Sequence, residues 1–209
     1  MLSALSEFIF QNTIKGFLDH EEGDALNHYV GGIAAVGPAL EVGSYCGKST
    51  VYIGEACRRS GNTLYALDHH RGSEEHQLGE EYHDPDLFDQ NEQLVDSFPL
   101  FRRTLRLADL EETVVPLVAK SEVVARHWAT PLGFVFIDGG HSPENALKDC
   151  LLWSAKVAIG GVFAVHDLFE HPHEGGQGPY QAFRRVLESG QFEKIDQVKS
   201  LGFLRKTQA

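Results

Sequence analysis

Four polar residues that can carry acid–base or metal chemistry stand directly after apolar segments of the sequence. Asp68 follows TLYAL, Asp138 follows LGFVFI, and the pair His166 and Asp167 follows VFAV. Short apolar runs that stop abruptly at a polar residue are typical of buried parallel strands. Because the carboxyl ends of parallel strands meet at one edge of a sheet, we expect these four side chains to share a site.

A glycine-rich stretch, LEVGSYCGKSTVYIG at residues 40–54, permits two interpretations. Gly47, Lys48 and the hydroxyl residues after them match the end of a phosphate-binding P-loop. That loop needs four residues before its Gly-Lys pair, whereas only three separate Gly43 from Gly47. The backbone nest around a phosphate depends on this length. We therefore favour a nucleoside-binding turn, with Lys48 facing solvent, and keep a P-loop-like nucleotide hydrolase as the alternative.

Two carboxylates support the nucleoside interpretation of this turn. Glu41 precedes Gly43 by two residues, and its carboxylate can accept from a ligand ammonium or order the turn. Asp68 ends the next predicted strand, where an acidic side chain can accept both hydroxyls of a ribose. The nicotinamide pattern GxGxxG is absent, since positions 45 and 46 are Tyr and Cys. A tight turn without a ligand is the simpler alternative.

The elements that must position these residues alternate along the chain. Strands are expected at 39–42, 63–67, 114–119, 132–137, 162–165, 192–198 and 201–205, and helices at 48–59, 100–108, 122–128, 143–157 and 180–189. This order predicts an α/β fold, a doubly wound Rossmann-like sheet of seven strands with helices on both faces. The last two strands are expected to form a C-terminal antiparallel hairpin.

Two segments lie outside this alternation. Residues 1–36 carry helical apolar spacing as far as Leu18, with a second helix expected at 24–36, and we interpret them as an N-terminal helical cap. Residues 69–99 are polar, rich in His and acid, and without periodicity, so a lid or substrate loop is expected there. We expect residues 1–209 to form a single domain.

Composition narrows the classes of partner and location. The chain of 209 residues has 18 basic and 30 acidic residues, a formal charge of −12, which disfavours nucleic acid as a partner. No run of about 18 apolar residues predicts a membrane span. The first residues lack a secretory pattern, and the three cysteines are widely spaced. These features predict a cytoplasmic protein with reduced thiols, and we expect a homodimer.

Two motifs resemble a known family. The stretch LEVGSYCGKST resembles motif I of class I S-adenosylmethionine-dependent methyltransferases, especially the catechol-type small-molecule O-methyltransferases. The stretch FIDGGHSPENALKDCLLW, followed by GGVFAVHD, is similar to the subgroup that includes sugar and macrolide O-methyltransferases. The resemblance covers roughly residues 38–167. It implies methyl transfer to a hydroxyl of a natural product, sugar or phenol, while a non-catalytic cofactor-binding module is a further alternative.

The resemblance also implies which residues contact S-adenosylmethionine. Those implied at the methionine end, the ribose and the adenine are Glu41, Gly43, Tyr45, Gly47, Ser49, Asp68, His69, Lys120 and Ser121, with Asp138 beneath the cofactor. For Lys120 and Ser121, the start of a surface helix is an equally good interpretation.

The reacting centre is expected at Asp138 and His141, within the segment IDGGH. Methyl transfer to a hydroxyl is a direct displacement that needs positioning and a base. Histidine titrates near neutral pH, and the resembled families carry the base at this position, so His141 is the expected base. A cap of the helix that starts at Ser142 is the alternative role for His141.

A divalent metal ion is a further possibility that the resemblance raises. The implied ligands are Asp138, His166 and Asp167. Magnesium prefers oxygen ligands, so a histidine in the set suits manganese, iron or zinc better. The other histidines of residues 69–99 and 171–173 are expected to be solvated.

Overall fold

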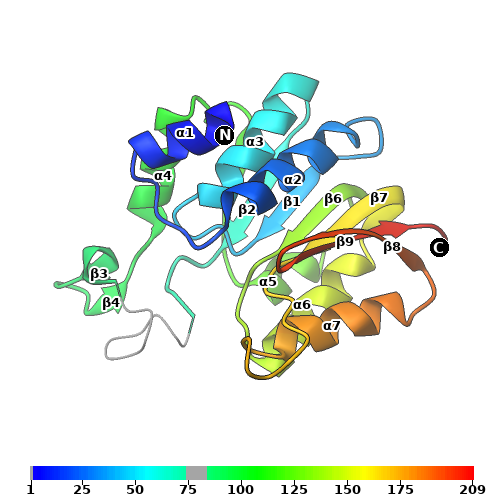
Figure 1. Cartoon of the computed structure of the whole chain (residues 1–209). Helices are drawn as coiled ribbons and strands as arrows, with labels where there is room; N and C mark the ends of the chain where they lie inside the picture. The colour runs from blue at the N-terminus through cyan, green and yellow to red at the C-terminus, as the bar shows by residue number, and fades with distance from the viewer. Residues whose placement is uncertain (1, 74–83) are drawn as a thin grey trace.

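One seven-stranded sheet organises the protein in a computed structural model that describes residues 2–73 and 84–209 (Figure 1). The strand order is β5-β2-β1-β6-β7-β9-β8. The strands are β1 (Ala39–Val42), β2 (Leu64–Asp68), β5 (Val114–Val118), β6 (Leu132–Ile137), β7 (Val157–Val165), β8 (Phe192–Val198) and β9 (Leu201–Lys206). The first five run parallel, and β9 is antiparallel to both β7 and β8. The predicted doubly wound sheet with its C-terminal hairpin is confirmed.

Helices cover both faces of this sheet. They are α1 (Ala4–Gln11), α2 (His20–Gly31), α3 (Lys48–Ser60), α4 (Phe98–Leu107), α5 (Ser121–Ala125), α6 (Pro143–Ser154) and α7 (Gly178–Leu187). In Figure 1, α2 and α3 lie side by side on one face, and α6 and α7 lie on the other. No helix in the described part of the chain has the length and apolar character needed to span a bilayer.

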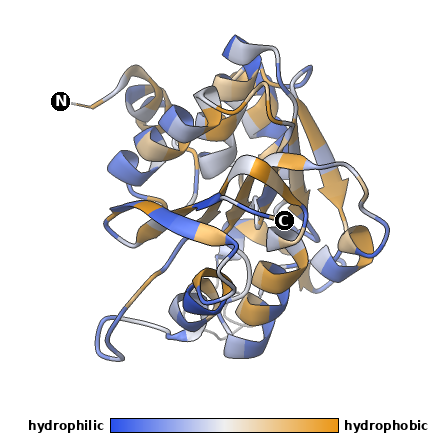
Figure 2. Cartoon of the chain, turned by 90° about the vertical axis from the view of Figure 1, so that its right-hand side faces the viewer, coloured by the Kyte–Doolittle hydropathy of each residue, from blue (hydrophilic) through white to orange (hydrophobic). Residues whose placement is uncertain are grey.

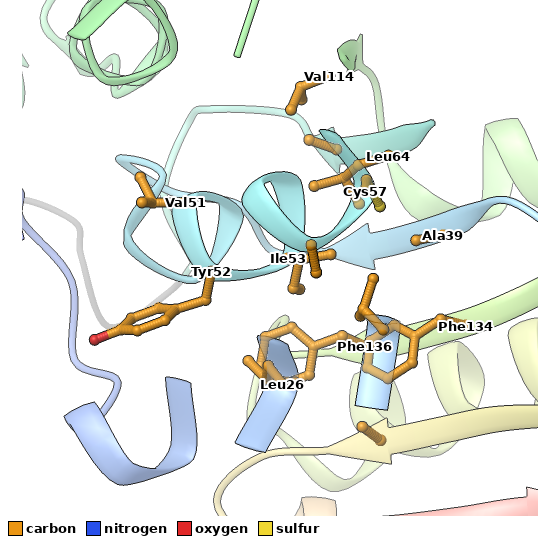
Figure 3. Close-up of a cluster of buried hydrophobic side chains, with 14 of the residues drawn as sticks. Leu26, Ala39, Val51, Tyr52, Ile53, Cys57, Leu64, Val114, Phe134 and Phe136 are labelled. Carbon is orange, nitrogen blue, oxygen red and sulfur yellow. The ribbon is translucent and has the colours of Figure 1, made fainter. Parts of the chain in front are cut away.

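The core consists of two layers separated by the sheet. Phe134 and Phe136 of β6 pack in the layer that α2 and α3 cover, where Figure 3 shows them near Leu26. The alternate residues, Val135 and Ile137, pack in the layer under α6 and α7. A strand buried on both faces has no polar alternation, which explains the unbroken apolar run before Asp138. Figure 2 shows the contrast with the helices, along which hydrophobic and hydrophilic residues alternate.

The prediction for the N-terminal segment was wrong in its boundaries. Helix α1 ends at Gln11, Thr13 has a left-handed φ of 51°, and residues 12–19 are not helical. Helix α2 begins at His20 rather than at 24 and ends at Gly31 rather than at 36. It begins there because Asp19 and Glu22 form a capping box. The side chain of Asp19 accepts from the backbone N–H of Glu22, and the side chain of Glu22 accepts from the backbone N–H of Asp19.

Two other boundaries differ from the predictions. Helix α6 ends at Ser154 instead of 157, and β7 starts at Val157 instead of 162. The early part of β7 pairs irregularly with β6, with a register shift between Leu132 and Phe134. The irregular part of the pairing includes Gly160 and Gly161, which directly precede the predicted strand 162–165.

The segment 69–99 is only partly irregular. Residues 74–83 lie outside the described residues, so the predicted lid is untested there. After them come a 3-10 turn (Pro85–Leu87) and a short antiparallel ribbon of β3 (Phe88–Asp89) and β4 (Leu94–Val95), which Figure 1 shows beside the main body. Lys15 Nζ contacts Asp84 at 2.5 Å and Asp86 at 2.7 Å. These ion pairs connect the ribbon to the non-helical segment 12–19.

Candidate active site

The glycine turn after β1 lies against the end of β6. Gly43 has a φ of +94°, and a Cβ on it would collide with the backbone carbonyl of Asp138. Gly47, with a φ of +91°, is the N-cap of α3. Only glycine meets both the conformation and the close approach at position 43. The turn therefore brings β1 and β6 together at the point where the strand order reverses, the usual ligand position in open α/β sheets.

Asp68 lies beside this turn, as the sequence predicted. Its Oδ2 accepts from the backbone N–H of Tyr45 at 2.8 Å, and its Oδ1 accepts from the backbone N–H of His70 at 2.7 Å. The side chain is half-buried. Asp68 thus holds both loops that border the expected ribose position, and its remaining lone pairs can accept from ligand hydroxyls.

His70, rather than His69, is the buried histidine of the loop after β2. His70 Nδ1 lies 2.8 Å from Ser97 Oγ, and the ring packs near Phe98 and Phe101. Burial lowers the pKa of His70, although the charge of Asp68 acts in the opposite direction. His69 is half-buried, and its Nδ1 accepts from a neighbouring backbone amide. The sequence carried no signal that distinguished the two.

Glu41 is fully buried beneath the glycine turn. Its Oε2 accepts from the hydroxyl of Thr50 at 2.5 Å, and burial raises the pKa of Glu41 to about 8. Among the described residues, three buried side-chain atoms have no hydrogen bond, namely Glu41 Oε1, Ser44 Oγ and His70 Nε2. Unsatisfied buried polar atoms next to a glycine turn fit a site whose polar ligand completes the hydrogen bonds.

The remaining residues predicted to contact the cofactor, apart from those described above, are Tyr45, Ser49, Lys120 and Ser121. Tyr45 has a left-handed φ of 45°, and its ring centroid lies 6.0 Å from that of Phe17. Ser49 is buried in the first turn of α3. Lys120 is exposed at the N-cap of α5, and Ser121 Oγ accepts from the indole N–H of Trp153 at 2.8 Å.

The prediction that Lys48 faces solvent was wrong. It is half-buried, and its Nζ donates to the carbonyl oxygen of Gly16 at 3.2 Å. Gly16 has no side chain, so the stem of Lys48 packs directly against its backbone. Lys48 therefore anchors the segment 12–19 to the start of α3, and burial lowers its pKa.

Asp138 and His141, which were predicted at the reacting centre, lie close to Asp167. His141 Nε2 lies 3.0 Å from Asp167 Oδ2. Burial alone would raise the pKa of Asp167, but hydrogen bonds from His141 and His166 hold it below its usual range. Asp138, His141 and Asp167 each offer one ligand atom, and these atoms lie within 4.8 Å of one another.

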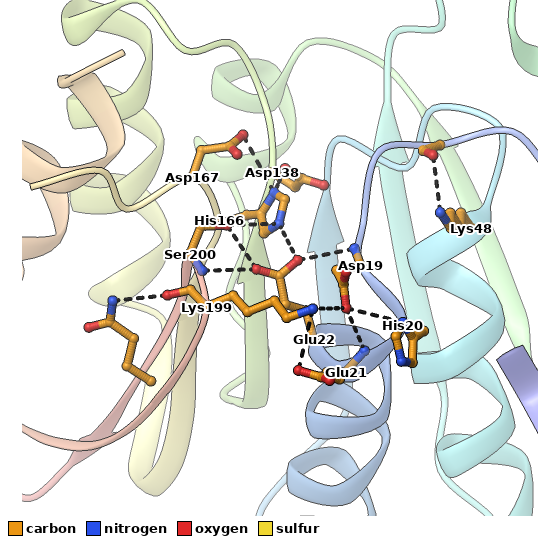
Figure 4. Close-up of polar contacts among 12 residues, drawn as sticks. Asp19, His20, Glu21, Glu22, Lys48, Asp138, His166, Asp167, Lys199 and Ser200 are labelled. Carbon is orange, nitrogen blue, oxygen red and sulfur yellow. Dashed lines mark hydrogen bonds and ion pairs between the residues drawn. The ribbon is translucent and has the colours of Figure 1, made fainter. Parts of the chain in front are cut away.

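His166, which was predicted as a metal ligand, lies between Asp138 and Asp167 on one side and Glu22 of α2 on the other. It is buried, with Nδ1 at 3.1 Å from Asp138 Oδ1 and 3.4 Å from Asp167 Oδ2, and with Nε2 at 2.9 Å from Glu22 Oε2 (Figure 4). Although burial alone would lower the pKa of His166, the charge and hydrogen bond of Asp138 and the other two carboxylates raise it far above its usual value. Each ring nitrogen of His166 thus lies within hydrogen-bond distance of a carboxylate oxygen.

Glu22 is a buried carboxylate beside the candidate site that the sequence analysis did not single out. It is 2% exposed, and its carboxylate reaches from α2 to His166. Its Oε1 accepts from the backbone N–H and the hydroxyl of Ser200, at 3.0 and 2.8 Å. The spacing of Asp19 and Glu22 could have revealed the capping box, but nothing in the sequence pointed to a contact with His166.

Solved structures with this fold were found by comparison of the whole chain. The O-methyltransferase NovP is 19% identical with a TM-score of 0.69, covering 90% of this chain and 80% of its own. The O-methyltransferase TomG from Streptomyces achromogenes, in complex with SAM, is 13% identical with a TM-score of 0.65, covering 97% and 87%. An O-methyltransferase from Bacillus cereus, in complex with SAH, is 16% identical with a TM-score of 0.62, covering 97% and 90%.

The sheet order, the glycine turn and the acidic residue at the end of β2 define a class I S-adenosylmethionine-dependent methyltransferase. A family model described as a methyltransferase domain matches residues 40–168, from the start of the glycine-turn motif to just beyond Asp167. This is more than half of the chain, and the protein therefore belongs to that methyltransferase family.

Proposed function

We propose that the protein transfers a methyl group from S-adenosylmethionine to a hydroxyl of a small molecule, such as a natural product, sugar or phenol. The observation that carries this proposal is the contact of 3.0 Å between His141 and Asp167 at the sheet edge beside the glycine turn. A histidine held by a carboxylate is an arrangement that removes a proton from a hydroxyl. The O-methyltransferases NovP and TomG, which share the fold, support the choice of a hydroxyl acceptor.

The cofactor would be held along the carboxyl edge of β1 and β2. Glu41 and Ser44 offer unsatisfied buried oxygens near its polar end, and Asp68 offers lone pairs to the ribose. We assign the other contacts to Gly43, Tyr45, Gly47, Ser49, His69, Lys120 and Ser121, as the resemblance implies. When bound, S-adenosylmethionine supplies a methyl group from its sulfonium, and the thioether that leaves needs no protonation.

In this proposal His141 accepts the proton of the acceptor hydroxyl. Its Nε2–H donates to Asp167 Oδ2, which fixes the tautomer and leaves Nδ1 as the accepting atom. The imidazolium that forms is stabilised by the same carboxylate. Asp138 lies next to this pair and can orient the hydroxyl through its half-buried carboxylate.

If the protein instead uses a divalent ion, Asp138, His141 and Asp167, whose ligand atoms form one cluster, would hold it, and His141 would then be a ligand rather than the base. A set of one imidazole and two carboxylates suits manganese, iron or zinc better than magnesium. Such an ion would supply a positive charge that favours the ionised hydroxyl. His166 belongs to the implied set, but its nitrogens are both engaged with carboxylates.

Calorimetry with S-adenosylmethionine and its demethylated product tests the cofactor, and methylation of a panel of phenols and sugars tests the reaction. His141→Ala should keep cofactor affinity and lose most of its turnover, by roughly 100-fold or more. His127→Ala, an exposed histidine after α5, is the matched control and should behave as the parent. Unchanged turnover in His141→Ala would remove His141 as the base, and absence of cofactor binding would reject the proposal.

Three further outcomes would distinguish the alternative functions. A thermal shift with ATP and magnesium, but none with S-adenosylmethionine, would indicate the P-loop-like hydrolase. Cofactor binding without any methyl acceptor would indicate a non-catalytic module. Turnover that a chelator abolishes and manganese restores would assign the ion its role. The homodimer, the cytoplasmic location and the single domain stay predictions, as does the lack of a nucleic-acid partner.

A further inference from the structure

Helix α2 contributes to the interior of the molecule a carboxylate, Glu22, whose contacts extend beyond its own helix. The capping box of α2 uses Glu22 Oε2 as the acceptor for the backbone N–H of Asp19, at 3.1 Å. The same carboxylate is 2% exposed, and it also contacts His166 and Ser200.

The buried ion pair of Glu22 and His166 is weak evidence for a stabilising role. Removing a carboxylate and an imidazole from water has a large desolvation cost, and apolar pairs of similar volume are often at least as stable. Leu26 and Val30, on the same helix, show that α2 packs well through apolar side chains. A charged pair in this position therefore favours a role in geometry.

The contacts form one continuous path from α2 to the expected base. Glu22 Oε2 lies 2.9 Å from His166 Nε2, and His166 Nδ1 lies 3.1 Å from Asp138 and 3.4 Å from Asp167. Asp167 in turn lies 3.0 Å from His141 Nε2. Figure 4 shows the His166 ring held between Glu22 on one side and Asp138 and Asp167 on the other. Because the ring is fixed at both nitrogens, it constrains the orientation of Asp167, the carboxylate that contacts His141.

We propose that Glu22 is a positioning residue of the reacting centre, which acts on His141 through His166 and Asp167. Glu22 itself lies outside the segment matched by the methyltransferase family, on a helix that the family model does not include. The consequence for turnover rests on the proposed function, whereas the coupling between Glu22 and His141 does not.

The test compares Glu22→Gln with Glu21→Gln, a matched control that makes the same change at an exposed carboxylate of the same helix. In both variants, the imidazole ¹H and ¹⁵N resonances of His141 and His166 are recorded by NMR, assigned by His141→Gln and His166→Gln. We expect Glu22→Gln to shift the resonances of both histidines, and Glu21→Gln to shift neither. A shift confined to His166 would overturn the coupling, even in a folded and active variant.

Turnover gives a second, independent measurement. With S-adenosylmethionine and the best acceptor of the panel, Glu22→Gln should lower kcat about tenfold or more, without changing the Kd of the cofactor. In a His166→Gln background, Glu22→Gln should have no additional effect, because it acts through that ring. Equal, additive losses in the two backgrounds would overturn the proposal. If Glu22→Gln does not fold, Glu22→Asp, which retracts the carboxylate from His166, takes its place.

The two failures are distinguishable. If the parent protein methylates no acceptor but Glu22→Gln shifts the His141 resonances, the coupling stands and the proposed function fails. If the parent is active and the His141 resonances do not move, the proposed function stands and the positioning role of Glu22 is rejected.

Discussion

The backbone N–H of Tyr45 donates to Asp68 Oδ2 at 2.8 Å, so the glycine turn after β1 is bound to the last residue of β2. The second carboxylate oxygen of Asp68 accepts from the N–H of His70 at 2.7 Å. One side chain therefore shapes two loops before any ligand is present. Replacing Asp68 should affect ligand binding both directly and through the shape of the turn.

Asp68→Ala should weaken the binding of S-adenosylmethionine by roughly 100-fold or more, because it removes hydrogen bonds to a charged group together with the ligand contact. Asp68→Asn, which keeps one acceptor oxygen, should lose less. Calorimetry measures both, and Glu193→Gln, an exposed carboxylate on β8, should bind as the parent does. Cofactor affinity in Asp68→Ala equal to that of the parent would contradict this role.

Gly43→Ala should destabilise the protein strongly, since its Cβ would meet the carbonyl of Asp138 and its φ is +94°. Gly61 is the matched control, because its φ is +67° but a Cβ there meets nothing within 4 Å. Gly61→Ala should cost about 1 kcal/mol and Gly43→Ala on the order of 3 kcal/mol or more. Urea denaturation compares them, and equal losses would show that backbone strain alone matters at position 43.

Glu41→Gln should change how stability depends on pH. Burial raises the pKa of Glu41 to about 8 in the folded protein, against 4.5 when unfolded. Between these values only the folded state holds the proton, so the parent should lose stability as pH rises from 4.5 to 8, and level off above. Glu41→Gln removes this loss, so its stability relative to the parent should increase with pH. Parallel stability curves from pH 5 to 8 would contradict the assignment.

Asp167→Asn should act in the acid range with the opposite sign. Its folded pKa lies below the usual 3.8, because His141 and His166 donate to it and outweigh burial. The stabilisation is complete above pH 3.8 and is lost as pH falls through the lower folded value. The parent should therefore lose more stability between pH 6 and 2 than Asp167→Asn does. Urea midpoints across this range measure the difference, and equal losses would exclude the contribution of Asp167.

The strands and the ends of the central elements could be predicted because they depend on local patterns. Apolar runs that end at Asp68 and Asp138, and glycines that turn the chain between a strand and a helix, are visible without tertiary contacts. The boundaries of α2 and β7 were wrong because a capping box and an irregular strand pairing determined them. A capping box depends on side-chain contacts at one helix end, and a strand pairing depends on a partner far away in the sequence. Neither is visible in the periodicity of apolar residues.

The candidate site was predictable only where a residue follows a strand. Asp138, which follows β6, was predicted for the site in this way together with His141, and Asp167, which comes just after β7, was predicted as a metal ligand. His166 contacts Glu22, which lies 144 residues away in the chain. No spacing rule connects such a pair, and the same holds for Ser200, which completes the shell of Glu22 from the turn between β8 and β9.

The contacts of Glu22 also determine how far the chain can be truncated. A fragment trimmed to the matched residues 40–168 would keep the glycine turn and every proposed catalytic side chain, yet lose both Glu22 and Ser200. His166 would then keep its two carboxylates on one side and face bare solvent on the other. For expression or for grafting onto another scaffold, the minimal working unit is therefore expected to run from Asp19 at least through β9.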